Sequence, residues 1–155
     1  MIEDLLCQTG LNMMQSFKEL EVWKQCRKLR NETRVLVINF PVEEKHRLSD
    51  QMIRASRSAT NQIAEGYGRF HFQENVQFCR IARGSLFEYI DHLSVASDSG
   101  YISEEVQCEL ENLTTSCIRL LNGYINYLLK VKGEYNQGKV NEESEEYRND
   151  ITSHC

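Results

Sequence analysis

The sequence has very few residues that interrupt helices. It contains one proline, Pro41, and eight glycines among 155 residues. A fold of short strands needs Gly or Pro at its turns, about every ten residues, so this composition argues against such a fold. The length suits one domain with a single buried core. We therefore expect one domain built from long helices.

The chain also lacks any long apolar run. No stretch approaches the roughly 18 consecutive apolar residues that indicate a transmembrane helix. The opening residues MIEDLLCQTGLN carry early acids and no basic segment, unlike a secretory signal. The six cysteines are scattered, without a C-x-x-C pair. We expect a cytoplasmic protein with no membrane partner, whose cysteines are core residues or exposed thiols.

Metal-ligand and catalytic patterns are scarce. Di-iron sites in four-helix bundles use Glu-x-x-His pairs on two helices, plus two further glutamates. His92 follows Glu88 at the fourth position instead of the third, and His46 and His71 fall in expected loops. No two histidines have the i, i+4 spacing of a helical metal site. We expect no metal, no cofactor and no enzymatic activity.

What the sequence does contain is helical periodicity. A first helix is expected from Ser16 to about Ile38, with Ser16 and Glu19 forming a capping box and Pro41 ending the run. A second should begin between Glu43 and Ser49 and end near Gly66, a residue typical of the C′ position. Their apolar faces comprise Phe17, Leu20, Trp23, Cys26, Leu29, Thr33 and Leu36, then Leu48, Met52, Ala55, Ala59 and Ile63.

Two more helices follow. The third is expected over 72–97, closed by Gly100, and the fourth begins after a Ser103 cap. Their apolar positions are Phe72, Cys79, Ala82, Leu86, Tyr89, Leu93 and Ala96, then Val106, Leu110, Leu113, Cys117, Leu120, Tyr124, Tyr127 and Val131. Four amphipathic helices with short links predict an all-α, up-down-up-down antiparallel four-helix bundle over residues 16–132.

The two ends of the chain differ from this bundle. Residues 1–15 are an extension of weak pattern, and Met13 or Met14 is an alternative start. Residues 133–155 are polar, with six acids against two bases, and predict an acidic disordered tail. Because the net charge is −5 and the tail carries −4, residues 1–132 sum to only −1.

Basic residues concentrate in the first two helices. If they share a surface, they could bind RNA or DNA through its phosphates. The alternative is that they are ordinary solvated helix faces. The candidates for a nucleic-acid interface are Lys24, Arg27, Lys28, Arg30, Arg54, Arg57 and Arg69.

Three segments resemble a known family. FKELEVWKQCRKL, FPVEEKHRLSDQMIRASRSATNQIAEGYGR and FCRIARGSLFEYIDHL look like the signature blocks of four-helix-bundle proteins encoded in intervening sequences of 23S ribosomal RNA genes. That family includes the accessory variability determinants of diversity-generating retroelements. The resemblance implies a homopentamer. In the retroelement branch it also implies binding of nucleic acid and of a reverse transcriptase.

The resemblance also draws attention to polar residues inside the second and third helices. The family pattern Ser-x-x-x-Asn-Ile-Ala-Glu-Gly would place its asparagine at Gln62, so either Asn61 is shifted by one place or Gln62 substitutes for it. We expect bonds from the second helix to Ser85, Glu88 or Arg83, with Gly84 allowing the backbones to approach. The expected polar helix or subunit interface comprises Ser58, Asn61, Gln62, Glu65, Gly84, Ser85 and Glu88.

Two functions fit these patterns. The first is a non-enzymatic, oligomeric protein that binds nucleic acid through its basic helix surfaces. The second is a protein-interaction scaffold, for example for a reverse transcriptase, without nucleic-acid binding of its own. Acids at Glu104, Glu105, Glu109 and Glu111 would suit a basic protein partner.

Overall fold

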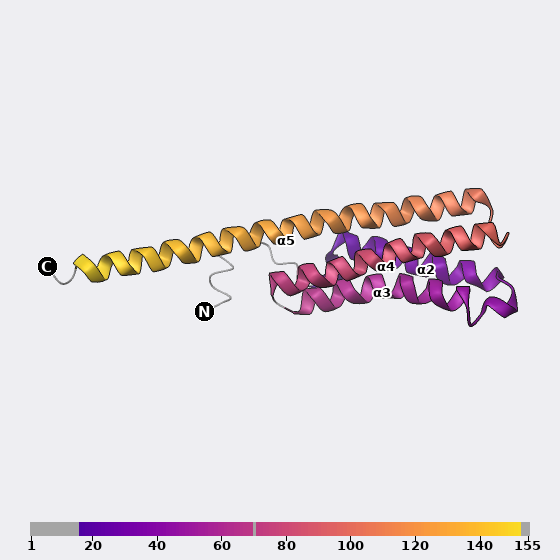
Figure 1. Ribbon diagram of the computed structural model, residues 1–155, viewed down its shortest axis with the longest axis horizontal. Coiled ribbons are helices and arrows are strands. Elements are labelled where there is room, and N and C mark those ends of the chain that lie inside the picture. The colour runs from indigo at the N-terminus through magenta and orange to yellow at the C-terminus, as the bar shows by residue number, and fades with distance from the viewer. Residues whose placement is uncertain (1–15, 70, 153–155) are drawn as a thin grey trace.

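Four α-helices make up most of the computed structural model, which describes the backbone of residues 16–69 and 71–152 and the side chains of 16–69 and 71–135. They are α2 (Glu21–Leu36), α3 (Leu48–Gly68), α4 (Phe72–Asp98) and α5 (Glu104–Thr152) (Figure 1). Short 3-10 turns lie at Phe17–Glu19 (η1), Val37–Asn39 (η2) and Val42–Glu44 (η3). The described residues contain no strand, so the all-α prediction is confirmed.

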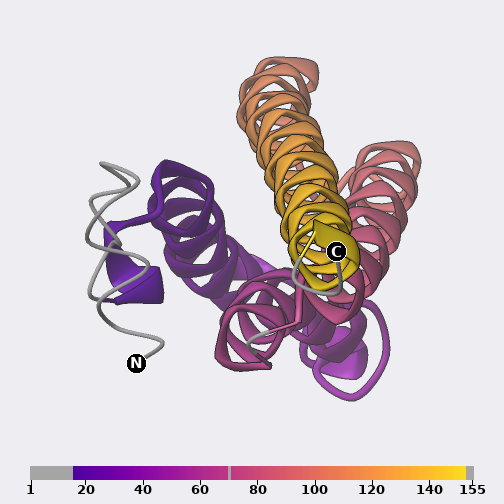
Figure 2. The ribbon, with the colours of Figure 1, turned by 90° about the vertical axis from the view of Figure 1, so that its left-hand side faces the viewer.

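The helices pack side by side in a closed set. Helix α3 contacts α2 and α4, and α5 contacts α4 and α2 (Figures 1 and 2). Arg30 of α2 bonds to Thr60 of α3, while the earlier Phe17 meets the later Tyr67. Earlier residues of the α2 region therefore lie beside later residues of α3, so these two helices are antiparallel.

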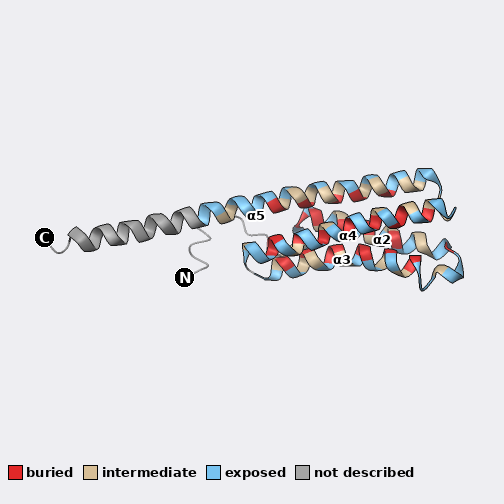
Figure 3. Cartoon of the chain, viewed as in Figure 1, coloured by how far each residue is buried: buried red, intermediate tan, exposed pale blue. Residues whose placement is uncertain are grey.

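The core follows the expected apolar faces of α3 and α4. All five apolar residues predicted for the second helix are buried in α3. The apolar residues predicted for the third helix are buried in α4, except Phe72, which is partly buried (Figure 3). Helical periodicity therefore identified the central pair of helices correctly.

The ends of α2 and the face of α5 differ from expectation. Ser16 accepts a hydrogen bond from Lys18 N and caps η1, so the long helix begins only at Glu21. On α5 the residues of the predicted stripe are buried or packed against the core as far as Tyr124, whereas Tyr127 is exposed. The buried residues of α5 after Cys117 are Leu121, Ile125 and Leu128.

Two glycines have different roles. Gly100 has φ of 72°, and its N–H and that of Tyr101 bond to Ser97 O and Ala96 O, so it ends α4 as predicted. Gly66 was expected to end the second helix, which is wrong. It lies inside α3, where a β-carbon would come 2.9 Å from Asn75 Oδ1. Its small size therefore serves packing.

The C-terminal segment continues α5. A disordered acidic tail was expected from Gly133, and the backbone that the structure describes there is helical as far as Thr152, past the bundle (Figure 1). This stretch has no proline and contains five Glu residues, which are good helix formers. The predicted extension over 1–15 lies outside the described residues. Within residues 16–69 and 71–152, no helix is both long and apolar enough to cross a membrane.

Candidate nucleic-acid interface

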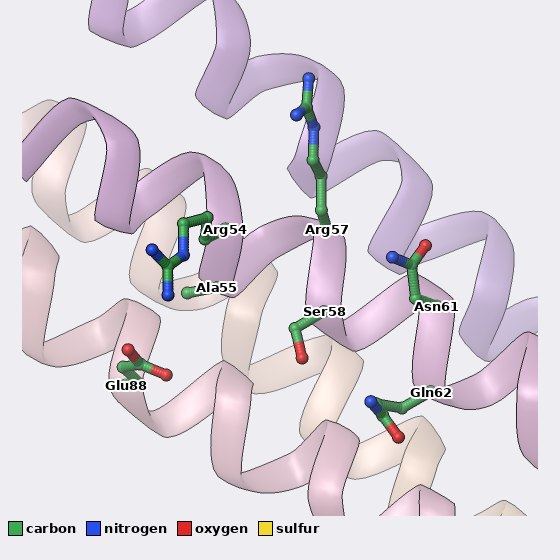
Figure 4. Close-up of a pocket in the computed structure, with 7 residues that line it drawn as sticks. All are labelled: Arg54, Ala55, Arg57, Ser58, Asn61, Gln62 and Glu88. Carbon is green, nitrogen blue, oxygen red and sulfur yellow. The ribbon is translucent and has the colours of Figure 1, made fainter. Parts of the chain in front are cut away.

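A groove opens between α3 and α4, with a volume of about 450 Å³ (Figure 4). It combines members of both predicted sets, the basic residues and the polar residues. Its lining residues are Arg54, Ala55, Arg57, Ser58, Asn61, Gln62 and Glu88. All but Glu88 belong to α3, where spacings of three and four residues bring them to one side of the helix.

The groove floor contains polar groups that are only partly satisfied. Ser85 Oγ of α4 donates to Ser58 Oγ of α3 at 2.9 Å, and this is the predicted link between the two helices. Gln62 Oε1 is buried and has no hydrogen-bond partner within the described residues. An unpaired buried carbonyl costs roughly 1–3 kcal/mol, so a donor that reaches this oxygen after a rotation of the Gln62 side chain would be bound favourably.

Glu88 supplies the groove's negative charge. Its Oε1 lies 3.5 Å from Nε2 of His92, one turn further along α4, and His92 is buried. In Figure 4 the Arg54 guanidinium is directed towards the α4 side, where Glu88 lies, whereas Arg57 extends away from Glu88. The groove therefore offers an acceptor, Glu88, on one wall and a cationic donor, Arg54, on the other.

The basic candidates divide by location. Arg30 Nη1 donates to Thr60 Oγ1 at 3.1 Å, which fixes the side of α2 that faces α3. At about 100° per residue, Lys24 and Lys28 lie about 120° and 160° around the helix from Arg30. They therefore do not share the surface formed by Arg30 and α3.

Arg34 was not among the predicted residues, yet it belongs to that surface. It lies one turn after Arg30, and Arg57 lies three residues before Thr60, so antiparallel packing places both towards the same end. The side chains of Arg34 and Arg57 are exposed and have no acidic partner in the described part of the chain. Helical spacing from Arg30 could have identified Arg34. We call Arg30, Arg34 and Arg57 the α2–α3 basic surface.

The other basic candidates have local partners. Arg69 pairs with Glu65 at 2.7 Å and its guanidinium also lies 5.2 Å from the centre of the Phe78 ring. Arg27 lies over Trp23. The remaining pairs are Lys24 with Glu21 at 3.6 Å, Lys28 with Glu32 at 3.7 Å and Arg54 with Asp50 at 3.7 Å. Such exposed pairs are weak, about 0–1 kcal/mol, so the cations remain available to a phosphate.

The expected polar network is smaller than predicted. Glu65 bonds to Arg69 of its own helix, and Arg83 donates to Asn122 of α5 at 2.7 Å instead of reaching α3. A β-carbon on Gly84 would have no neighbour within 4 Å. The close approach of α3 and α4 depends on Gly66, because Gly84 lies on the outer side of α4.

The described residues contain no group of three or more His, Cys, Asp or Glu side chains that could hold a metal ion. Burial raises the pKa of the Cys79 thiol to about 12 and that of the Tyr124 phenol to about 12. Both side chains therefore stay protonated near neutral pH.

Comparison with known proteins places the chain in a family. The model of the 23S rRNA-intervening sequence protein family matches residues 18–123. The chain belongs to this family, as its three sequence blocks indicated. No curated protein matches the sequence.

A solved structure has a similar fold. It is a protein of unknown function from the S23 ribosomal protein family of Bacteroides thetaiotaomicron, with a TM-score of 0.61 and 19% sequence identity. The alignment covers 67% of this chain and 97% of that chain. At this identity the similarity extends to the fold alone.

Proposed function

We propose that the protein is a non-enzymatic, oligomeric nucleic-acid-binding protein. The observation that carries this proposal is the α2–α3 basic surface, in which Arg34 and Arg57 have no acidic partner within the described residues. Unpaired guanidinium groups on one face attract a polyanion, because each phosphate contact releases condensed counterions. Residues 133–155 carry −4 of the net charge of −5, so most of the acidic excess of the chain lies outside the bundle that bears this surface.

The oligomer is proposed to be a homopentamer of up-down-up-down bundles. Support comes from the outer side of α4, where Gly84 has open space around it. Ile81 and Phe87, each three residues from Gly84, are 44% and 57% exposed, and Val95, further along α4, is 43% exposed. A glycine within a helix costs about 1 kcal/mol relative to alanine. Close contact with a neighbouring subunit would give this glycine and its apolar surroundings a role.

A protein scaffold is the second candidate. Three acids at the start of α5, Glu104, Glu105 and Glu109, are exposed and have no basic partner among the described side chains. They would suit a basic partner such as a reverse transcriptase. This function requires no binding of nucleic acid.

Binding measured against salt tests the two functions. Fluorescence anisotropy would follow labelled single-stranded RNA and duplex DNA titrated with the full chain at several salt concentrations. Each neutralised phosphate should contribute about −0.9 for duplex DNA, or −0.7 for single strands, to the slope of log K against log salt. If neither nucleic acid binds at low salt, the nucleic-acid function is wrong and the scaffold takes its place.

A further inference from the structure

The α3–α4 groove has a hydrogen-bonding pattern that phosphate binding alone does not explain. A site for phosphate needs cations and N–H donors, yet this groove includes the Glu88 carboxylate and the unpartnered buried Oε1 of Gln62. A negative carboxylate beside a phosphate site weakens binding. The ligand should therefore present N–H donors as well as acceptors.

An unpaired nucleobase has both kinds of group. Sequence-specific readers of single-stranded RNA stack the splayed bases and bond to their Watson–Crick and Hoogsteen edges, whereas in a duplex the Watson–Crick edge is already paired. The groove volume of about 450 Å³ lies in the range of small-molecule sites. The neighbouring α2–α3 basic surface would hold the phosphates on either side of such a base.

Guanine is the base that complements this groove best. Its Watson–Crick edge presents N1–H and N2–H side by side, two donors that match the two oxygens of the Glu88 carboxylate. Its O6 and N7 are the acceptors that arginine contacts most often. Arg54 is directed towards the α4 wall on which Glu88 lies, so one base could engage both residues (Figure 4).

We propose that the groove binds an unpaired guanine of single-stranded RNA or DNA, with Glu88 accepting from N1–H and N2–H. The carbonyl of Gln62 is a further acceptor at the groove floor. This inference rests on the nucleic-acid binding proposed above. It adds a base preference to the sequence-independent attraction of the phosphates.

Two carboxylates on α4 provide the test. Glu88 lines the groove, whereas Asp91, three residues on, is exposed and lies outside it. Removing any acid near a polyanion site should strengthen binding if the attraction is only electrostatic. For a base-reading carboxylate the sign is opposite, so Glu88→Gln should weaken binding of a guanine-containing strand about tenfold while Asp91→Asn strengthens it slightly.

The probes are short uridine-rich RNA and DNA strands with one central guanine, inosine or adenine, measured by fluorescence anisotropy. Inosine lacks the N2 amino group, so it should bind about tenfold more weakly than guanine to the wild-type chain, and this difference should vanish in Glu88→Gln. Comparing RNA with DNA shows which sugar is preferred. Circular dichroism melts of both variants confirm that they fold.

Each outcome separates the two proposals. If guanine, inosine and adenine strands bind equally, or if Glu88→Gln strengthens binding as Asp91→Asn does, the guanine site is overturned while nucleic-acid binding stands. If no strand binds at low salt, both proposals fail.

Discussion

A β-carbon on Gly66 would lie 2.8 Å from Cβ of Phe78, so the backbone of α3 rests directly against α4 at this point. Real β-carbons do not approach so closely, and the other nearby atoms belong to Asn75, which is buried and donates to the Tyr124 hydroxyl at 3.1 Å. The contact therefore joins three helices, α3, α4 and α5, through one glycine.

Gly66→Ala should destabilise the protein. Overpacking costs about 1–3 kcal/mol, and the better helix propensity of alanine returns about 1 kcal/mol, so the free energy of unfolding should fall by up to about 2 kcal/mol. Gly123→Ala is the matched control, because a β-carbon there has no neighbour within 4 Å. Urea unfolding followed by circular dichroism measures both. A rise in stability for Gly66→Ala would contradict the close contact.

Gly84→Leu should reduce the size of the proposed oligomer. A leucine side chain would fill the open space on the outer side of α4 and hold a neighbouring subunit away, whereas Gly123→Leu introduces the same side chain on α5. Light scattering should show a multiple of the 18.1 kDa chain for wild type and for the control, and a smaller mass for Gly84→Leu. If the wild-type protein is a clean monomer at micromolar concentration, the oligomer proposal is wrong.

Tyr89 should make the protein less stable in alkali. Burial raises the pKa of its phenol to about 12, although the hydrogen bond with Thr33 lowers it. Above about pH 10 the unfolded chain releases this proton while the folded chain keeps it, so unfolding becomes more favourable by up to about 1.4 kcal/mol per pH unit. This loss of stability is complete when the pH reaches the pKa of Tyr89 in the folded protein, about 12.

Tyr89→Phe isolates that contribution, because the other groups that titrate in alkali, Tyr124 among them, are present in both proteins. The difference in unfolding free energy between wild type and variant should be constant below about pH 9 and then shift in favour of the variant up to pH 12. At neutral pH the variant should lose about 1 kcal/mol with the Thr33 hydrogen bond. Parallel losses of stability in the two proteins would contradict the assignment.

Residues 136–155 should contribute little to bundle stability. The acidic stretch lacks an apolar face in its sequence, and α5 extends past the other helices (Figure 1). A stop codon after Tyr135 should therefore leave the melting temperature nearly unchanged in a calorimetric scan. A large drop would show that this segment docks on the bundle.

The apolar faces of α3 and α4 could be predicted from the sequence because each of these helices packs against two neighbouring helices along most of its length. The fourth helix was harder. Its apparent stripe from Val106 to Val131 alternates steps of four and three, a period of about 3.5, which drifts about 20° per heptad on a straight helix. By Tyr127 that stripe has rotated away from the core, and Leu121, Ile125 and Leu128 are the buried residues of the helix after Cys117.

The candidate site was only partly predictable. Residue types and helical spacing identified Arg57, Ser58 and Glu88, but contacts between helices depend on distances that one sequence does not encode. The Arg30–Thr60 bond, which orients α2, is of this kind. Gly66 shows the same limit, because a glycine that ends a helix and a glycine that admits a neighbouring helix look alike in sequence.

The role of the α2–α3 basic surface can be tested by comparing two double variants that lose the same number of positive charges. Arg34→Gln with Arg57→Gln removes two positive charges from this surface. Lys24→Gln with Lys28→Gln removes the same number from the other side of α2. Neither pair touches the core, since all four side chains are exposed, so both double variants should melt near the wild-type temperature. Both double variants have the same net charge, so a difference in their binding would come from where the charges were removed.

Only the arginine pair should change the binding of nucleic acid substantially. If Arg34 and Arg57 each contact one phosphate, their loss should reduce the slope of log K against log salt by about 1.8 for duplex DNA or 1.4 for single strands, from about 0.9 or 0.7 per phosphate. The lysine pair should leave the slope near its wild-type value, because those side chains face away from α3. Anisotropy titrations at several salt concentrations measure all three slopes. Equal slopes for the two double variants would mean that the α2–α3 basic surface is an ordinary solvated face, and that any bound nucleic acid lies elsewhere on the molecule.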